Sequence, residues 1–477
     1  MQHDEQVNYL FFNYFGEKAV YIEQLAAAGS DRIYFRVKSL HYSAIACYGS
    51  DSKENLTFIH HAQHFKQQQL SVPQVYCHTD DFLYYLQEDL GNTSLYDIIR
   101  KVGVTENVEQ LYKKAIDGLI DLQIKGAIDF NFDSCYPIKS FDKSSMFWDM
   151  NAFKYYFVRM AKIQFNEVEL NKDFHALCDE LLKEKNLYFM YRDCQARNIM
   201  IHEDKPYFID FQGGRKGAPQ YDLASLLWQA GAKIPMEKRI EWLDYYIQKL
   251  SNYININKQE FKERYYGFVL IRMLQVLGAY GFRGLIEKKP HFIESIIPAL
   301  ENIKWFLDNR LFPIELKELE KTLYILIESD LFTNELKKYP KNSPLSIEIN
   351  SFSFKRAIPE DKSGNGGGFV FDCRGILNPG RYEPYKNQHG KDKEVIDFLE
   401  QKTKVKDFLE NVWRIIDINI EDYIARNFEH LQINFGCTGG QHRSVYCAEQ
   451  TKKYIESRYP VKVTIRHIER EMNGQYI

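Results

Sequence analysis

The spacing of hydrophobic and polar positions changes along the chain and predicts its parts. Across residues 32–38, RIYFRVK, hydrophobic side chains occupy every second position, as a strand with one buried face requires. Residues 43–48, SAIACY, and 82–87, FLYYLQ, predict further strands. Between them, residues 53–65, KENLTFIHHAQHF, suit a helix. Residues 1 to about 90 are therefore expected to form a small, β-containing lobe.

The pattern turns helical from about residue 105 to residue 330. Apolar residues recur there every three or four positions, as they do across residues 108–122. One short interruption, residues 198–211, NIMIHEDKPYFIDF, has two apolar stretches that flank the polar turn HEDKP and predicts a β-hairpin. Residues 91–335 are thus expected to form a larger, mostly α-helical lobe.

A second domain is expected after residue 335. Residues 336–346 contain KKYPKNSP, whose Pro, Asn, Ser and Lys residues predict a linker. Beyond it, four strand-like runs (SFSFK, GFVFDCR, LQINFG and VKVTIRH) alternate with helical patterns around residues 391–403, 405–427 and 441–457. This alternation predicts a small α/β domain over residues 347–477.

Composition narrows the class of protein. A chain of 477 residues is too long for one ordinary core, and 45% hydrophobic with 27% charged residues is typical of a globular protein. The formal net charge of -3 gives no general attraction to nucleic acid or to an anionic membrane. The eight cysteines form no CxxC pair or regular framework, so no zinc site is indicated and a reducing compartment is expected.

Targeting signals are not evident in the sequence. The N-terminal MQHDEQVNYLFFNYFG has acidic residues and no basic region, unlike a signal peptide. We find no continuous apolar run that approaches the roughly 18 residues of a membrane span. The protein is therefore expected to be cytoplasmic, without a membrane partner.

Three polar residues in the predicted hairpin region carry candidate chemistry. Asp193 and Asn198 bracket a short loop, and Asp210 follows at the end of the second hairpin strand. Phosphoryl transfer needs a carboxylate that orients the acceptor hydroxyl, and an Asn and an Asp that hold Mg²⁺ at the phosphates. A hairpin brings the outer ends of its strands to one place, so the three groups can meet. Taken singly, each residue is explained as well by a turn cap or a strand end.

Together these residues carry a resemblance. YRDCQARNIM followed by IDFQGG resembles the catalytic loop and metal-binding turn of the aminoglycoside-phosphotransferase and protein-kinase-like superfamily, with Tyr191 where His is common. DFQ followed by PQYDLASLL is most similar to the anomeric sugar kinases of N-acetylmuramate and N-acetylglucosamine. The resemblance covers about residues 5–330 and implies an α+β bilobal protein-kinase-like fold. It also implies that Asp193 is the catalytic base, that Asn198 and Asp210 bind Mg²⁺, and that Asp222 anchors the catalytic loop.

The resemblance implies ATP as the nucleotide, although the sequence motifs for nucleotide binding are weaker than those of the catalytic loop. YLQEDLG resembles the hinge that receives adenine and implicates Glu88 and Leu90. AAAGSDRIYFR has one glycine where protein kinases have three, so Gly29 and Ser30 are interpreted either as a phosphate loop or as an ordinary turn.

The third predicted strand, SAIACY, lacks the Lys that pairs with phosphate in protein kinases. Arg32 and Arg36 of the second strand are candidate substitutes, although a solvated strand face explains them nearly as well. An inactive, kinase-like binding protein is therefore the alternative.

The sequence narrows the class of molecule that accepts the phosphoryl group only in part. An aminoglycoside kinase needs an acidic pocket, whereas the helices over residues 230–310 mix both signs of charge without an acidic cluster. This favours a neutral or anionic acceptor. Several aromatic residues are candidates for stacking on a sugar ring or, equally, for the core: Trp228, Tyr245, Tyr246, Tyr265 and Tyr266.

A second constellation lies in the C-terminal region. INFGCTGGQHRSVYCAEQ predicts a strand, a glycine-containing loop and the start of a helix, whose backbone N–H groups form an anion cradle. His442 and Arg443 add donors, so a phosphorylated ligand is expected. Cys437 and Arg443 have the C-x5-R spacing of cysteine-dependent phosphatases, followed by Ser444. Gly436 replaces the usual preceding His, and a buried, inert Cys437 is the alternative.

This region resembles a second family. FSFKRAIP, FVFDCRGILNP and GCTGGQHRSV together resemble the C-terminal domain of RapZ, an adaptor that senses glucosamine 6-phosphate, over about residues 345–470. The phosphosugar site implied by this resemblance comprises Asp372, Arg374, Asn378, Cys437, Thr438, Gly439, Gly440, Gln441, His442, Arg443, Ser444 and His467. For the first three, an Asp–Arg pair and a turn cap are the simpler alternatives.

The chain departs from RapZ in its first domain. A GxxxxGK[ST] phosphate loop is absent from the sequence, and a sugar-kinase-like domain stands in its place. Residues 345–477 carry 20 Lys and Arg against 19 Asp and Glu, so RNA binding is not supported.

The combined expectation is a Mg²⁺-ATP-dependent sugar kinase followed by a phosphosugar-sensing domain, acting on small molecules in cell-wall recycling. A non-catalytic adaptor and a phosphatase at Cys437 remain the alternatives, and the oligomeric state is not predicted.

Overall fold

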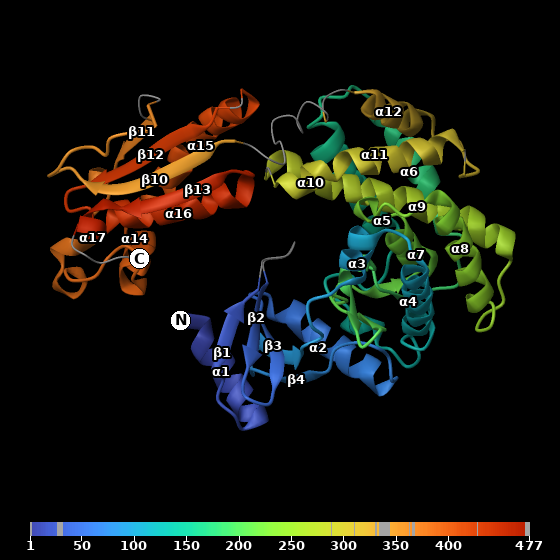
Figure 1. The fold of residues 1–477 in the computed structure, drawn as a ribbon. Coiled ribbons are helices and arrows are strands. Elements are labelled where there is room, and N and C mark those ends of the chain that lie inside the picture. Colours follow the sequence, from blue (N-terminus) through green and yellow to red (C-terminus); the bar gives the residue numbers. More distant parts are fainter. Residues whose placement is uncertain are drawn as a thin grey trace. The chain divides into compact units, whose positions relative to one another are not determined.

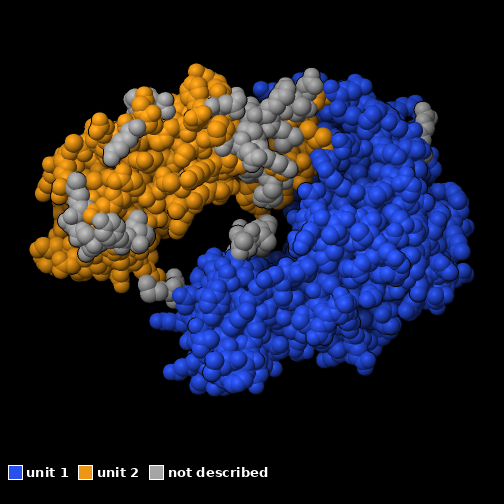
Figure 2. All heavy atoms as spheres, viewed as in Figure 1, with its two compact units in different colours: residues 1–282, 298–328 blue, residues 283–297, 329–477 orange. Residues whose placement is uncertain are grey.

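The computed structural model describes residues 2–25, 32–287, 289–309, 311–329, 332, 344–361, 363–364, 368–426 and 428–472. Contacts group the chain into two compact units, coloured separately in Figure 2: residues 1–282 with 298–328, and residues 283–297 with 329–477. Most of the predicted linker, 336–346, lies outside the described residues, so the domain boundary there stays a prediction.

The first unit opens with the predicted small lobe (Figure 1, blue). Its five strands form an antiparallel sheet in the order β1-β2-β3-β5-β4. The elements are α1 (Gln2–Phe15), β1 (Tyr21–Gln24), β2 (Ile33–Lys38), β3 (Ser43–Tyr48), α2 (Ser52–Gln67), β4 (Val75–His78) and β5 (Tyr84–Glu88). The three predicted strands and the helix between them are confirmed, while β1 and β4 were not predicted.

Local sequence positions two parts of this lobe. Val7 and Phe11 of α1 pack against the apolar side chains of β2 and β3, including Phe35 and Val37. Asp51 caps α2, because its carboxylate accepts the backbone N–H groups of Lys53 and Glu54. The cap fixes where the first turn of α2, which carries Glu54, begins.

The predicted larger lobe is mostly helical, as expected (Figure 1, cyan to yellow). Between residues 95 and 328 the chain forms α3 (Leu95–Val102), α4 (Glu106–Ile124), η1 (Phe132–Ser134), α5 (Lys143–Ala152), η2 (Phe153–Val158), α6 (Glu167–Leu181), β6 (Tyr188–Met190), η3 (Ala196–Asn198), β7 (Ile199–His202), β8 (Lys205–Phe208), β9 (Arg215–Gly217), α7 (Gln220–Leu227), η4 (Ala230–Ala232), α8 (Met236–Leu250), α9 (Lys258–Tyr280), η5 (Gly281–Ile286), α10 (Pro290–Glu294), α11 (Ile296–Asp308) and α12 (Lys317–Glu328). The predicted hairpin is β7 with β8, and β6 pairs with β9. The chain thus has the α+β bilobal arrangement expected of a protein-kinase-like fold.

One helical stretch corrects the sequence expectation on membrane spans. Among the described residues, Lys258–Ile286 is long and apolar enough to cross a membrane by length and composition, with a mean hydropathy of 1.3. Arg272 interrupts its apolar run, which is why no continuous run stood out in the sequence. Because 56% of this stretch is buried inside the structure, it has the character of a core helix.

The second unit contains the predicted α/β domain (Figure 1, orange to red). Its four parallel strands have the order β11-β12-β10-β13. The elements of the C-terminal region are β10 (Ser346–Ser353), β11 (Gly368–Asp372), η6 (Cys373–Gly375), η7 (Pro379–Arg381), η8 (Glu383–Tyr385), α14 (Lys393–Lys402), α15 (Val405–Ala425), β12 (His430–Cys437), α16 (Arg443–Arg458), β13 (Lys462–His467) and α17 (Ile468–Met472). Alternate residues of β10 and β12, such as Ile349 and Ile433, join the apolar core with α14, α15 and α16.

Candidate active site and candidate ligand loop

The β7–β8 hairpin brings two predicted metal ligands to one end. Ile199 pairs with Phe208, and the backbone N–H of Ile209 donates to the carbonyl of Asn198 over 3.0 Å. Asn198 and Asp210 therefore lie beside each other at the open end of the hairpin. The buried hydroxyl of Tyr191, where His is common, donates to the carbonyls of Asn198 and Ile209 and holds the two ends together.

The predicted base lies next to this pair. The Asn198 side-chain amide donates to the carbonyl of Asp193 over 2.9 Å, which leaves the Asn198 oxygen free to face a cation. Asp210 has a φ of +64°, in the left-handed region that Asp adopts more readily than most non-glycine residues. The structure thus places the backbone of Asp193 against Asn198, and Asn198 beside Asp210, while the roles predicted for their side chains stay predictions.

Asp222, on α7, is hydrogen-bonded to the backbone of the predicted catalytic loop. Its buried carboxylate accepts the backbone N–H groups of Tyr191 and Arg192, each over 2.8 Å, and the side-chain amide of Gln123 over 3.0 Å. Burial raises the pKa of Asp222 to about 6. These contacts are those expected of the anchoring role proposed for this residue.

Two buried arginines surround the base. Arg192 forms a bidentate pair with Asp149, with nitrogen–oxygen distances of 2.6 and 2.7 Å. Arg272 of α9 places both terminal nitrogens 3.3 Å from Asp193 Oδ1. Desolvation opposes the charge of Asp193, but Arg272, Arg192 and Arg197 outweigh it and hold the pKa of its carboxyl below the usual value. Asp193 is therefore ionised at neutral pH, as the base role predicted for it requires.

Arg32, a candidate substitute for the missing third-strand Lys, lies between two carboxylates. Its Nη2 lies 3.4 Å from Glu54 Oε1, and its Nη1 lies 4.0 Å from Asp210 Oδ1. Arg32 is buried, and none of its guanidinium nitrogens forms a hydrogen bond with the part of the chain that the structure describes. A buried cation without hydrogen-bond partners among the described residues, beside the predicted metal ligand Asp210, fits a phosphate group.

Arg36, the second candidate, has a different role. Its guanidinium pairs with Asp89 over 2.8 and 2.9 Å, and it also donates to Asn92 and to the carbonyl of Gly91. These contacts fix the turn after β5, so we assign a phosphate-facing position to Arg32 alone. The sequence pattern could not separate the two arginines, because they are four residues apart and an alternating strand would place both on the same face.

Of the other residues predicted to bind the nucleotide, the structure describes Glu88 and Leu90. Glu88 ends β5, where its carboxylate accepts the backbone N–H of Gln74 over 3.0 Å, and Leu90 is buried in the turn that follows. Gly29 and Ser30 lie outside the described residues, so their role stays a prediction.

The donor set suits Mg²⁺ held partly by phosphates. Among the described residues, His, Cys, Asp and Glu form no group of three or more that could hold a metal ion alone. Mg²⁺ is typically bound by one or two carboxylates together with substrate phosphates and waters. One carboxylate at Asp210 and one amide oxygen at Asn198 fit that pattern.

A cavity lies beside the catalytic loop in the larger lobe. It is a shallow hollow that spans about 380 Å³ with the open solvent at its mouth included, and its walls come from the predicted catalytic loop, α7 and the residues after it, α9 and α11. Its lining is mainly neutral, with Gln195, Ser225, Gln229 and Asn302 among the polar groups, and it includes Arg272. Sequence reasoning missed Arg272. The available signal was a single charged residue within the apolar run GFVLIRMLQVLGAYGF.

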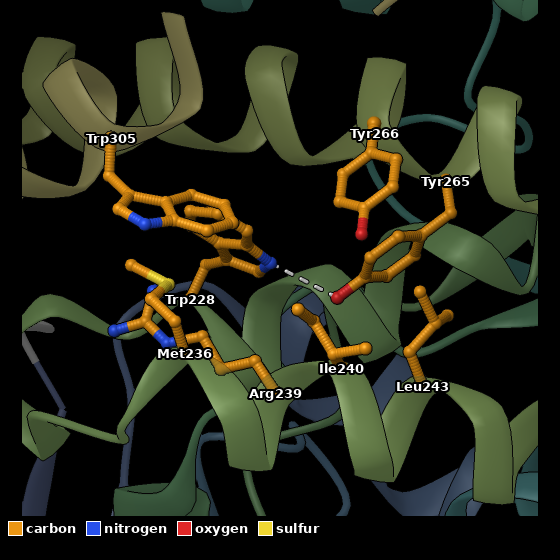
Figure 3. A pocket seen from close by; sticks show the side chains of 8 residues that line it. All are labelled: Trp228, Met236, Arg239, Ile240, Leu243, Tyr265, Tyr266 and Trp305. Carbon is orange, nitrogen blue, oxygen red and sulfur yellow. Dashed lines mark hydrogen bonds between the residues drawn. The ribbon is translucent and has the colours of Figure 1, made fainter. Parts of the chain in front are cut away.

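The aromatic candidates fall into two sets. Tyr246 is buried in the core, whereas Trp228, Tyr265 and Tyr266 line a smaller pocket of about 210 Å³ with Trp305. Figure 3 shows the Trp228 indole N–H donating to the Tyr265 hydroxyl, over 3.1 Å. Trp228 also lines the larger cavity and so separates the two spaces.

The predicted ligand loop of the C-terminal domain joins β12 to α16. Cys437 Sγ accepts the backbone N–H of Gly440 over 3.2 Å and lies 3.2 Å from Ser444 Oγ. Arg443 donates to the carbonyls of Arg374 and Ile376 and, over 3.4 Å, to the hydroxyl of Thr438. Thr438 and Gly439 are exposed, so the tip of the loop is open to a ligand.

The other residues predicted to bind the phosphosugar differ in their contacts and in their exposure. Gln441 and His442 are tied to the carbonyls of Gln388 and Tyr385, over 2.6 and 2.8 Å. Asp372 and Arg374 form an exposed pair at 2.7 Å, and their location is accessible to a ligand. Asn378 accepts the N–H of Gly380 over 3.2 Å, which is the turn cap considered as its alternative.

His467 is placed differently from an exposed ligand residue. It is completely buried, with one ring nitrogen 2.8 Å from Ser351 Oγ and the other 3.1 Å from Glu449 Oε1. Direct contact between His467 and a ligand thus stays a prediction, and the observed contacts are those of a residue that orients β13.

Family models match both parts of the chain. Residues 49–259 match the phosphotransferase enzyme family, and residues 345–470 match the RapZ C-terminal domain. The chain therefore carries, in this order, a region that matches the phosphotransferase enzyme family and a region that matches the RapZ C-terminal domain.

Curated relatives share part of the chain. A nucleotide-binding protein of Lactobacillus acidophilus is 36% identical over 154 residues, which are 31% of this chain and 51% of that protein. A nucleotide-binding protein of Methylobacillus flagellatus is 38% identical over 134 residues, 28% of this chain and 45% of that protein. The chain spans about half the length of the curated relatives it matches.

Solved structures of kinases are similar at a low level. A choline kinase from Streptococcus pneumoniae has a TM-score of 0.44 and 12% identity, covering 65% of this chain and 100% of that one. An amicoumacin kinase in complex with AMP-PNP and Ca²⁺ has a TM-score of 0.47 and 12% identity, covering 66% and 97%. Likeness of this degree says nothing of the substrate.

Proposed function

We propose that this chain is a Mg²⁺-ATP-dependent sugar kinase whose C-terminal domain binds a phosphosugar. The acceptor is an N-acetylated amino sugar of the N-acetylmuramate or N-acetylglucosamine type, phosphorylated at its anomeric hydroxyl in the cytoplasm, during cell-wall recycling. The convergence of Asp193, Asn198 and Asp210 at one end of the hairpin carries this proposal.

The residues divide the work of phosphoryl transfer. Asp193 orients the acceptor hydroxyl and takes its proton as the oxygen attacks the γ-phosphorus, and ADP leaves from the opposite side. Asn198 and Asp210 would hold Mg²⁺, which when bound neutralises charge on the β- and γ-phosphates. Arg32, paired with Glu54, supports the phosphates from the small lobe. Tyr191 and Asp222 hold the catalytic loop in place.

The cavity beside Asp193 favours this acceptor class. A polycationic aminoglycoside or a quaternary ammonium ion would meet the Arg272 guanidinium in its wall, with no acidic side chain among the lining residues. Neutral amides and hydroxyls at Gln195, Ser225 and Asn302 match the hydroxyl and acetamido groups of an amino sugar.

The full chain should be incubated with ATP, Mg²⁺ and a panel of N-acetylmuramate, N-acetylglucosamine, an aminoglycoside and choline, with ADP measured. ADP release is expected with at least one amino sugar and not with either cation. Asp210→Asn should abolish it. Absence of turnover with every amino sugar would reject the assignment. If nucleotide and phosphosugar bind without any turnover, the chain is instead a non-catalytic adaptor.

A second activity is favoured by one observation in the ligand loop. Cys437 Sγ accepts the backbone N–H of Gly440 and lies beside Ser444, the second residue of α16, in a position that is only 2% exposed. This arrangement supports phosphatase action on a sugar phosphate. Cys437→Ser should then abolish phosphate release, whereas phosphosugar binding without release leaves the loop a sensor.

A further inference from the structure

Arg272 is a charged residue in an otherwise apolar stretch of α9. Its side chain is 4% exposed, yet its terminal nitrogens reach the base Asp193, whose side chain is 47% exposed. Its other hydrogen-bond partners among the described residues are neutral: Gln275 Oε1 at 2.7 Å and the Tyr221 hydroxyl at 3.4 Å. A buried guanidinium is costly unless a negative charge is near, so Arg272 depends on Asp193.

This dependence changes during the reaction. Both contacts from Arg272 to Asp193 are 3.3 Å long, whereas the neighbouring Arg192 has a bidentate partner in Asp149 at 2.6 and 2.7 Å. In the proposed reaction, Asp193 accepts a hydrogen bond from the acceptor hydroxyl and then takes the proton of that hydroxyl. At that point the charge of Arg272 is no longer matched by Asp193.

The cavity offers space for a matching group. Arg272 is the one Lys or Arg among its lining residues, and Asp and Glu are not among them. Ser225, which is 2% exposed, also lines the cavity, and its hydroxyl has no hydrogen-bond partner among the described residues. A buried hydroxyl without a partner and a loosely paired guanidinium both point to a ligand that supplies acceptor oxygens.

We propose that this cavity is the acceptor site and that Arg272 pairs with a carboxylate on the acceptor, while Asp193 engages the acceptor hydroxyl. The inference rests on the proposed function and narrows it: the preferred acceptor is an acidic amino sugar rather than a neutral one. Arg272 is then the residue that determines this specificity.

The test compares three acceptors that differ at one group. N-acetylmuramate carries a lactyl carboxylate, its carboxamide keeps the shape without the charge, and N-acetylglucosamine lacks the lactyl group. kcat/KM is measured for each with the full-length wild-type chain, Arg272→Gln, Arg272→Lys and the matched control Arg264→Gln. Arg264 lies on the same helix and pairs with Glu260 over 2.9 Å. Binding of each sugar is also measured by calorimetry without nucleotide.

The wild type and Arg264→Gln should prefer the carboxylate over the carboxamide by at least about tenfold in kcat/KM, because an unpaired buried charge is costly. Arg272→Gln should lose this preference, and Arg272→Lys should keep part of it. If Arg272→Gln does not fold, the wild-type ratio and the Lys variant still decide.

Two failures can be told apart. Turnover of all three sugars at similar kcat/KM by the wild type, or an equal loss on all three in Arg272→Gln, would overturn the role of Arg272 and leave the kinase assignment intact. Selective binding of N-acetylmuramate, lost in Arg272→Gln but without turnover, would keep the acceptor site and reject the kinase function.

Discussion

The guanidinium of Arg32 lies 3.4 Å from the carboxylate of Glu54, although the two residues belong to the edge of β2 and the first turn of α2. Protein kinases place a third-strand Lys beside a helix Glu for the same purpose of holding phosphates. We propose that Arg32, which directly precedes β2, supplies this cation here, in place of a Lys in the third strand, SAIACY.

Arg32→Gln should lower kcat/KM for ATP by about 100-fold, because one preorganised phosphate contact is lost. For Arg32→Lys, kcat/KM for ATP should lie between the values of the wild type and Arg32→Gln, since Lys keeps the charge but lacks the planar, two-pronged guanidinium. Arg159→Gln, which removes an exposed pair with Glu167, is the control and should match the wild type. Equal kcat/KM for ATP in Arg32→Gln and the wild type would exclude this role.

The acidic limb of the pH–activity profile should move in Arg272→Gln. Arg272 is the first of the cations that hold the pKa of Asp193 below its usual value. Its removal disfavours the carboxylate, so the pKa of Asp193 rises and activity is lost at a higher pH as the solution is acidified. kcat/KM measured from pH 4 to pH 8 reports the shift. An unmoved limb, or one moved to lower pH, would contradict the pairing.

Much of the fold could be predicted, because its signals are local. The strands RIYFRVK and SAIACY and the hairpin around HEDKP were read from alternation, and all are present. The edge strands β1 and β4 have only four residues each and little alternation, so the sequence pattern did not reveal them.

The candidate site was predictable where motifs are contiguous. Asp193, Asn198 and Asp210 lie within one short segment, whereas Arg272 lies 79 residues from Asp193 in the chain. Its contact with the base depends on the packing of α9 against the catalytic loop, which no local pattern encodes. The separate roles of Arg32 and Arg36 likewise depended on where Glu54 and Asp89 fold.

Asp222 should couple stability to pH. Because burial raises the pKa of Asp222 from 3.8 to about 6, the folded chain retains a proton that the unfolded chain releases in this interval. This group therefore stabilises the fold below about pH 4, and its contribution of about 3 kcal/mol is lost as pH rises through 6. Denaturant unfolding between pH 4 and pH 7 should show this fall in the wild type and not in Asp222→Asn.

Asp222→Ala tests the anchor itself. It leaves the N–H groups of Tyr191 and Arg192 and the amide of Gln123 without their acceptor. The free energy of unfolding should drop by about 3 kcal/mol, and kinase activity should be lost at temperatures where the chain is still folded. Unchanged activity would show that the catalytic loop is held by other contacts.

The ligand loop offers a matched pair of glycines. Gly440 has a φ of +65°, and a Cβ there would lie 2.4 Å from Glu469 Cγ and 3.0 Å from the Ser353 nitrogen. At Gly439, by contrast, a Cβ would have no described atom within 4 Å. Gly440→Ala should lower Tm and weaken binding of glucosamine 6-phosphate by about tenfold or more, because the loop must move. Gly439→Ala should keep the wild-type Tm.

Calorimetry on the full chain measures the binding in both variants. If Gly440→Ala binds glucosamine 6-phosphate as tightly as the wild type, the loop between β12 and α16 is not the phosphosugar site.

Transfer of labelled phosphate from [γ-³²P]ATP to N-acetylmuramate tests the central claim most directly. We expect the wild-type chain with Mg²⁺ to produce a labelled sugar phosphate, and Asp193→Asn and Asp210→Asn each to reduce its formation by at least about 1,000-fold, since each removes a group that acts on the reacting atoms. A labelled sugar formed equally by the wild type and both variants, or no label transferred by the wild type to any amino sugar, would contradict it.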